Sequence, residues 1–225
     1  MNNLRNLGSS RVTSILLVVN ILVFAIMTLA GGSQNISNLV RFGAVVKDRI
    51  AYGEWWRLFT ASFIHIGFMH ILLNMYFLYQ IGPVFEKLYG SRNFLIIYLL
   101  AGIMGNLLTF AFGSSSTVSA GASTSLYGLF GLAIGIMLNY KGDSMLSSFG
   151  ASFLSVIAIN IVYSLINPSI GLLGHLGGLL AGVILAGIFP VINRSLPTST
   201  QVISASAYII SVSYTHLRAH ETPEH

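Results

Sequence analysis

The chain has 225 residues, of which 54% are hydrophobic and only 8% charged, and its mean hydropathy is +0.78. Soluble domains carry about 25% charged residues, so this composition excludes an ordinary soluble protein and indicates a chain that contacts lipid. The net charge of +5 does not indicate a nucleic-acid partner, because the sequence has no basic run interleaved with aromatic residues. The absence of cysteine excludes disulfides, thiol catalysis and Cys-ligated zinc.

Six stretches are apolar and long enough to cross a bilayer, which takes about 20 residues as a helix. The sequence therefore predicts an all-α polytopic membrane protein with a six-helix bundle over residues 13–193, preceded by a cytoplasmic segment, residues 1–12. A long first loop, residues 32–65, is expected on the outer side. The predicted helices lie near residues 13–31, 66–85, 93–112, 122–140, 149–167 and 171–192.

The C-terminal tail, residues 194–225, is expected to differ from the rest. Residues 201–214 begin like a seventh helix, but the apolar stretch is too short to span a membrane. The polar segment 215–225 is unlike anything upstream, and we interpret it as a truncated or non-native end. Its three histidines, His216, His220 and His225, are therefore not expected to belong to a site.

The positive charges predict the orientation. Basic residues precede the first helix and follow the second, fourth and sixth, whereas the loops 113–120 and 167–171 carry none. The positive-inside rule therefore puts the N-terminus in the cytoplasm. The first loop is an exception to this rule, since it places basic residues on the outer side. Its aromatic residues Tyr52, Trp55 and Trp56 would anchor it in the membrane interface. The basic residues are Arg5, Arg11, Lys87, Arg92, Lys141 and Arg194 on the inner side, and Arg41, Lys47, Arg49 and Arg57 in the first loop.

Four polar residues are expected at a similar depth near the outer ends of the helices. His70 and Asn74 lie in the first turns of the second helix, Ser123 in the first turn of the fourth, and His175 in about the second turn of the sixth. These three helices all run from outside to inside, and each residue adds about 1.5 Å of rise. Because polar side chains inside membrane helices are costly, such residues are candidates for a functional site.

Ser123 has two readings. A serine at a helix start is often an N-cap, which would be a structural role. It could instead be a nucleophile, because the unpaired backbone N–H groups of a helix start stabilise an oxyanion. Thr124 and Ser125 are rival hydroxyls that spacing does not exclude, and Gly121 precedes the group.

His175 is the candidate base. It shares a helix face with Gly178 and Gly182, and small residues at this spacing let two helix backbones approach closely. No Asp or Glu is expected at this depth, so a Ser-His dyad is favoured over a triad. Tyr127, one turn below Ser123, would either buttress a neighbouring ring or simply pack in the core.

His70 and Asn74, at positions i and i+4, share one helix face. They are suited to donating hydrogen bonds to an oxyanion, or they form a structural polar pair between helices. His65 lies off that face and is interpreted as a loop-packing residue. His65 and His70 are badly spaced to share a metal ion, and the sequence offers neither an acidic partner nor an H-E-x-x-H run. No metal site is therefore expected.

Taken in order, these residues resemble the rhomboid family of intramembrane serine proteases. The resemblance covers about residues 10–192, and each piece is weak alone, whereas the ordered set is specific. The matching pieces are Trp56-Arg57, His65-x4-His70-x3-Asn74, Glu86-Lys87-x2-Gly90, Gly121-Ala122-Ser123 with Tyr127, and His175-x2-Gly178-x3-Gly182.

The resemblance implies a role for each matching residue. Ser123 would be the nucleophile and His175 the general base, with Tyr127 packed against the imidazole. The oxyanion hole would comprise His70, Asn74 and the Ser123 backbone N–H. Gly178 and Gly182 would let the sixth helix approach the fourth. Trp56, Arg57 and Glu86 would be structural.

The resemblance also implies a substrate class and a setting. Family members cleave transmembrane segments of membrane proteins near the outer face and need no cofactor, so membrane proteins and lipids are the expected partners. The expected location is a bacterial plasma membrane. Thr124 departs from the glycine that often follows the nucleophile, and its β-branched side chain is expected to crowd the substrate pocket. The alternatives are an inactive relative that binds membrane clients or, from another class, a small transporter.

Overall fold

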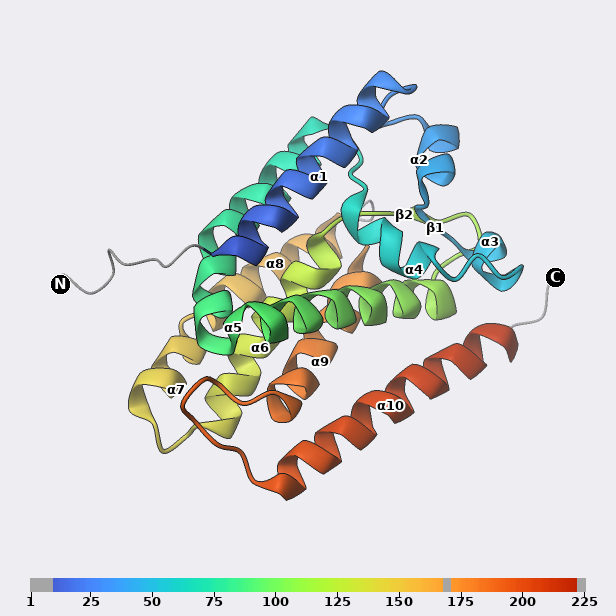
Figure 1. The fold of residues 1–225 in the computed structure, drawn as a ribbon. Coiled ribbons are helices and arrows are strands. Elements are labelled where there is room, and N and C mark those ends of the chain that lie inside the picture. Colours follow the sequence, from blue (N-terminus) through green and yellow to red (C-terminus); the bar gives the residue numbers. More distant parts are fainter. Residues whose placement is uncertain (1–9, 168–170, 222–225) are drawn as a thin grey trace.

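The computed structural model describes residues 10–167 and 171–221, and it is built almost entirely of helices (Figure 1). The predicted all-α fold is confirmed. The α1, α5 and joined α7–α8 segments are long and apolar enough to cross a membrane, and α6 and α9 are shorter apolar helices. The main helices are α1 (Arg11–Leu29), α5 (Phe68–Phe112), α6 (Ser123–Asn139), α7 (Ser144–Ala151), α8 (Leu154–Ile166), α9 (Leu172–Ile188) and α10 (Thr198–Glu221).

The second and third predicted helices are joined in α5, with a sharp break at Gly90. Gly90 has φ +75° and ψ 153°, values outside the helical region. A positive φ favours glycine because a Cβ would clash with the backbone there. The break therefore lets one continuous run of residues serve as two helices.

Two other elements differ from the sequence prediction. The fifth predicted helix, 149–167, corresponds to α8 and the end of the shorter α7. Helix α7 begins before the predicted start, at Ser144, because Asp143 caps it by accepting a hydrogen bond from the Leu146 N–H at 3.1 Å. The partial helix expected over 201–214 is longer, since α10 continues to Glu221 and includes polar residues expected to lie outside it.

Helix α10 packs along α5 and α9 (Figure 1). The Tyr208 hydroxyl donates to the Leu100 carbonyl in α5 at 2.9 Å, and the Gln201 amide donates to the Ile188 carbonyl in α9 at 3.1 Å. These bonds attach a helix of mixed polarity to the bundle.

The first loop is folded rather than open. It contains α2 (Ile36–Phe42), β1 (Val45–Val46), α3 (Lys47–Ala51), α4 (Arg57–Thr60) and the 3-10 turn η1 (Ala61–Phe63). Strand β1 pairs antiparallel with β2 (Val118–Ser119), with Val45 opposite Ser119. This pairing ties the first loop to the segment that leads into α6.

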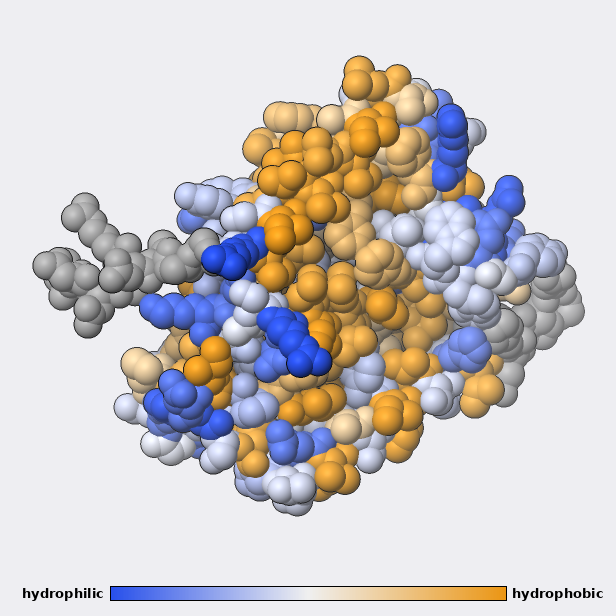
Figure 2. Space-filling view, viewed as in Figure 1, coloured by the Kyte–Doolittle hydropathy of each residue, from blue (hydrophilic) through white to orange (hydrophobic). Residues whose placement is uncertain are grey.

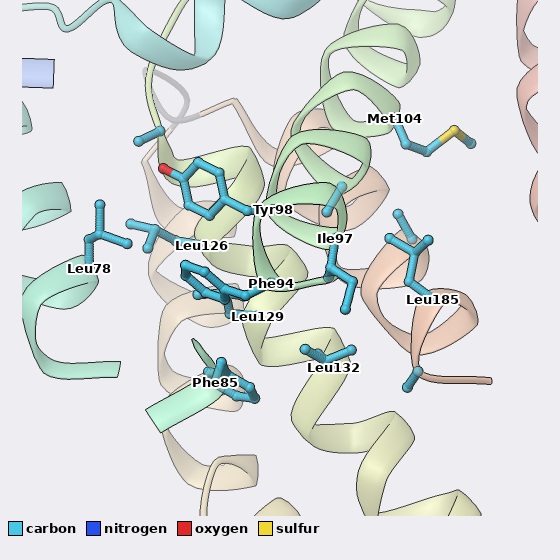
Figure 3. Close-up of a cluster of buried hydrophobic side chains, with 14 of the residues drawn as sticks. Leu78, Phe85, Phe94, Ile97, Tyr98, Met104, Leu126, Leu129, Leu132 and Leu185 are labelled. Atoms are coloured by element: carbon cyan, nitrogen blue, oxygen red, sulfur yellow. The ribbon is translucent and has the colours of Figure 1, made fainter. Parts of the chain in front are cut away.

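The core lies between α5, α6 and α9. Large apolar side chains from these helices meet there, among them Leu78, Phe94, Leu129 and Leu185 (Figure 3). Each of these four side chains is fully buried. Close packing of this kind contributes to the association of helices in lipid, where the hydrophobic effect between helices is absent.

The outer surface has an apolar middle. Figure 2 shows hydrophobic residues along α1 and across the centre of this face, with hydrophilic residues gathered over the first loop and around α7. On α1, Ile15, Val18, Leu22 and Ile26 are all more than half exposed. Lipid tails would cover such a surface, which a soluble monomer rarely presents.

Candidate active site

Helix α6 begins at Ser123, and the residue in the N-cap position is Ala122. The N-cap reading of Ser123 is therefore not observed. Its hydroxyl instead lies 3.0 Å from Nε2 of His175, within hydrogen-bonding distance. The sequence separation of these residues is 52, so the contact depends on the packing of α9 against α6.

The close approach of α6 and α9 depends on glycine. A Cβ at Gly178 would collide with the backbone carbonyl oxygen of Thr124, and one at Gly182 would collide with that of Gly128. A Cβ at Gly131 of α6 would likewise meet the carbonyl oxygen of Leu179. The predicted face of small residues is thus present on both helices, and it brings the His175 ring level with Ser123.

The imidazole of His175 is held in a fixed orientation. It stacks on the Tyr127 ring, with centroids 4.0 Å apart and planes inclined by 10°. His175 is 8% exposed and Tyr127 5% exposed, so water reaches little of either ring. The Tyr127 ring therefore serves as a platform that keeps Nε2 aimed at Ser123.

The two rival hydroxyls point elsewhere. Ser125 is fully buried and faces Gly102 of α5, and its Oγ has no hydrogen-bond partner. The side chain of Thr124 lies between Gly105 of α5 and Gly174 of α9. The expectation that Thr124 crowds the substrate pocket is therefore not met, because its methyl group fills a gap between helices.

His70 lies over the turn that precedes Ser123. Its Nδ1 accepts a hydrogen bond from the Ile66 backbone N–H at 3.3 Å, so a neutral ring carries its proton on Nε2. A Cβ placed on Gly121 would lie 2.8 Å from this Nε2 and 3.5 Å from the Ser123 hydroxyl. Gly121 also has φ +140°, which disfavours any side chain. The absence of a side chain thus leaves the His70 N–H open toward the serine.

Asn74 is buried one turn further along α5. Its amide nitrogen donates to the His70 carbonyl at 3.0 Å. An amide NH₂ has two protons, so one Asn74 N–H remains available for a second hydrogen bond. The first N–H groups of α6 have no partner within the helix, and donors of these kinds are the ones that stabilise an anionic oxygen.

His65 has a more specific role than loop packing. Its Nε2 accepts a hydrogen bond from the Ala122 backbone N–H at 3.3 Å, and the neighbouring Gly121 N–H donates to the Ala61 carbonyl at 2.9 Å. Burial lowers the pKa of His65 to about 3, and the nearby His70 adds to the shift. A neutral His65 therefore holds the turn before Ser123 against the first loop.

The residues expected to be structural have contacts that fit that role. Arg57 is buried and donates to the Val40 carbonyl at 2.7 Å and to Glu54 at 2.6 Å, and its guanidinium lies 4.6 Å from the Trp56 ring centre. At the opposite end of the bundle, Glu86 accepts from the backbone N–H and hydroxyl of Thr13, each at 2.8 Å. Glu86 thereby caps the start of α1.

One contact of the site was missed from the sequence. The hydroxyl of Ser164 in α8 lies 3.2 Å from Nδ1 of His175 and 3.4 Å from the Tyr127 hydroxyl. The sequence feature that could have indicated this contact is a polar residue, Ser164, in an otherwise apolar helix at about the depth of Ser123. In the part of the chain that the structure describes, no cluster of three or more His, Cys, Asp or Glu residues could hold a metal.

Comparison with known proteins places the chain in a family. The model of the Rhomboid domain matches residues 52–191, which contain every one of the site residues above. The chain belongs to the rhomboid family. It is an integral membrane protein with the polytopic helical fold of rhomboids, and residues 10–51 and α10 lie outside the matched rhomboid domain.

Named relatives agree with the rhomboid assignment. The chain is 38% identical over 175 residues to Rhomboid protease GluP of Bacillus subtilis (strain 168), covering 78% of this chain but 34% of that protein. It is 33% identical over 137 residues to Putative rhomboid protease YdcA of the same strain, covering 61% of this chain and 68% of that protein. Rhomboid-like protease 1 of Toxoplasma gondii is 35% identical over 150 residues, covering 64% of this chain and 50% of that protein. The chain thus spans only about a third of GluP.

Proposed function

We propose that this chain is an intramembrane serine endopeptidase in which Ser123 is the nucleophile and His175 the general base. The observation that carries the proposal is the 3.0 Å contact between the Ser123 hydroxyl and Nε2 of His175, at a helix start that no side chain caps. A nucleophile within hydrogen-bonding reach of a base is the geometry that acyl transfer needs. The relatives named rhomboid proteases support the same reaction.

In the acylation step, the Ser123 oxygen attacks the carbonyl carbon of the scissile peptide while its proton moves to Nε2 of His175. The carbonyl electron pair moves to oxygen and makes an oxyanion. The Nε2–H of His70, the free N–H of Asn74 and the Ser123 backbone N–H donate to that oxygen. When the tetrahedral intermediate collapses, the C–N bond breaks and His175 returns the proton to the leaving amine.

In the deacylation step, water attacks the acyl-serine. His175 removes a proton from the water, and the same donors hold the second oxyanion. The ester bond to Ser123 then breaks, and the serine oxygen recovers a proton from the imidazole. The bundle around Ser123 and His175 keeps this polar chemistry out of contact with lipid tails.

The substrate is proposed to be a transmembrane segment cut near the outer face, with residues 13–193 as the protease core. Ser123, His70 and His175 lie near helix starts at the end of the bundle that carries the first loop. The opposite end carries Lys87 and the exposed ion pair between Arg194 and Asp143, 2.8 Å long. Under the positive-inside rule, that basic end faces the cytoplasm and the N-terminus is inside.

The test compares the wild type with Ser123→Ala, His175→Ala and Ser125→Ala in proteoliposomes that contain a single-span substrate. Ser125→Ala is the matched control, because Ser125 is the neighbouring buried hydroxyl that faces away from His175. We expect cleavage by the wild type and the control only. Cleavage by Ser123→Ala would refute the nucleophile, and absence of cleavage by a folded wild type across several substrates would favour a relative that binds clients without cutting them.

A further inference from the structure

Ser164 contacts the one ring nitrogen of His175 that the reaction leaves unused. Its Oγ lies 3.2 Å from Nδ1, while Nε2 faces Ser123. Ser164 and Ile157 are the buried residues of α8, seven positions apart on one face, whereas Ile159 and Leu165 are exposed. The apolar helix α8 therefore directs a hydroxyl inward at the base.

The protons of this contact can be assigned by counting. A serine hydroxyl has one proton and two lone pairs. The Ser164 hydroxyl donates its proton to the Asn160 carbonyl at 2.9 Å, so toward His175 it can only accept. The second lone pair can accept the hydroxyl proton of Tyr127, 3.4 Å away. Nδ1 of His175 must then carry the ring proton, which leaves the Nε2 lone pair free for Ser123.

Resting on the proposed function, we propose that Ser164 is a positioning residue that holds His175 in the tautomer able to act as a base. In triads, a carboxylate on Nδ1 has this role. Here a neutral hydroxyl, oriented by its own hydrogen bond to the carbonyl four residues earlier, takes that place. When Nε2 gains the proton from Ser123, the Nδ1–H stays on the ring and remains bonded to Ser164.

The competing interpretation is purely structural. Serine in membrane helices often bonds back to the carbonyl at i−4 with no further role. If that were its only role, loss of the Ser164 hydroxyl would leave the tautomer of His175 unchanged. The two interpretations therefore differ in the protonation of the ring, which can be measured separately from activity.

The experiment measures both the tautomer of His175 and the kinetics. In ¹⁵N-histidine-labelled protein, the His175 signals are identified by their loss in His175→Ala, and the tautomer is read from the ring nitrogen shifts. We expect a protonated Nδ1 in the wild type and a mixture of tautomers in Ser164→Ala. The kcat of Ser164→Ala should fall about tenfold, the worth of one neutral hydrogen bond, with little change in KM.

The controls separate positioning from folding and from the proposed function. Ser155→Ala makes the same change at an exposed position of α8 and should leave both readouts unchanged. Ser164→Thr retains the hydroxyl and should restore the tautomer. The inference is overturned if Ser164→Ala keeps a fully protonated Nδ1, or if Ser155→Ala shows the same losses. The tautomer is measured without substrate. A wild type that fails to cleave would therefore refute the proposed function, while the measurement of the His175 tautomer could still support or overturn the role of Ser164.

Discussion

At the scale of single residues, removal of a hydrogen-bond donor near Ser123 should lower the rate of cleavage and leave substrate binding nearly unchanged. His70 carries its proton on Nε2, next to the space above Gly121. Removing one oxyanion donor typically lowers kcat by about 10²–10³-fold. We therefore expect His70→Ala to lose kcat in this range, with KM nearly unchanged. Steady-state cleavage in proteoliposomes measures both, and Tyr79→Ala, an exposed position of α5, serves as control. An unchanged kcat in His70→Ala would remove His70 from the oxyanion hole.

His65 makes the fold sensitive to acid. Its pKa is about 3 in the folded protein and 6.5 as a free side chain, so between these values the unfolded chain binds the extra proton. The stability that neutral His65 contributes is therefore complete above about pH 6.5 and decreases as the pH falls toward 3.

The measurement is thermal unfolding in detergent at neutral and mildly acidic pH. His65→Gln keeps an acceptor for the Ala122 N–H but does not titrate. We expect the melting temperature of the wild type to fall more steeply with acid than that of His65→Gln. Equal slopes in the two proteins would show that His65 does not carry this dependence.

The sequence allows a residue to be predicted as part of the site when its depth along a helix is enough to place it there. Ser123, His70 and His175 could be placed together because rise along straight helices fixes their depth. Ser164 and the role of His65 could not be derived in this way. The Ser164 contact depends on how α8 is rotated about its axis, and the His65 bond joins a side chain to a backbone N–H 57 residues away.

At the scale of elements, the α6–α9 contact should tolerate no added side chain. Gly182 lies against the Gly128 carbonyl, where a Cβ has no space. Overpacking of this kind costs about 1–3 kcal/mol or more. We expect Gly182→Val to lower the melting temperature clearly and to abolish cleavage. Gly142→Val is the matched control, because a Cβ at Gly142 meets nothing within 4 Å. Equal stability of the two variants would contradict the packing described here.

The elements themselves were largely predictable, and the exceptions have local causes. Apolar length located α1, α6 and α9 within a few residues. The short helices of the first loop were not located, because helices such as α3 and α4 are stabilised by tertiary bonds rather than by periodicity. Arg57 is the example: its buried guanidinium bonds to Val40 and Glu54, which no local pattern reveals.

At the scale of the whole molecule, the orientation in the membrane can be tested directly because the chain contains no cysteine. Single cysteines can be placed at exposed positions in loops at opposite ends of the bundle, as Ser115→Cys and Gly142→Cys. With the N-terminus inside, a membrane-impermeant maleimide applied to intact cells should label Ser115→Cys and spare Gly142→Cys until the membrane is permeabilised. The reverse pattern would invert the proposed topology and place the active site at the cytoplasmic face.

The most direct test of the central claim is the location of a covalent adduct formed by a fluorophosphonate probe. This reagent reacts with a serine whose hydroxyl is activated by a base. We predict that mass spectrometry finds the adduct on Ser123 of the folded wild type, and that His175→Ala abolishes labelling while Ser125→Ala retains it. An adduct on Ser125, or labelling of Ser123 that persists in full without His175, would contradict the Ser123–His175 dyad.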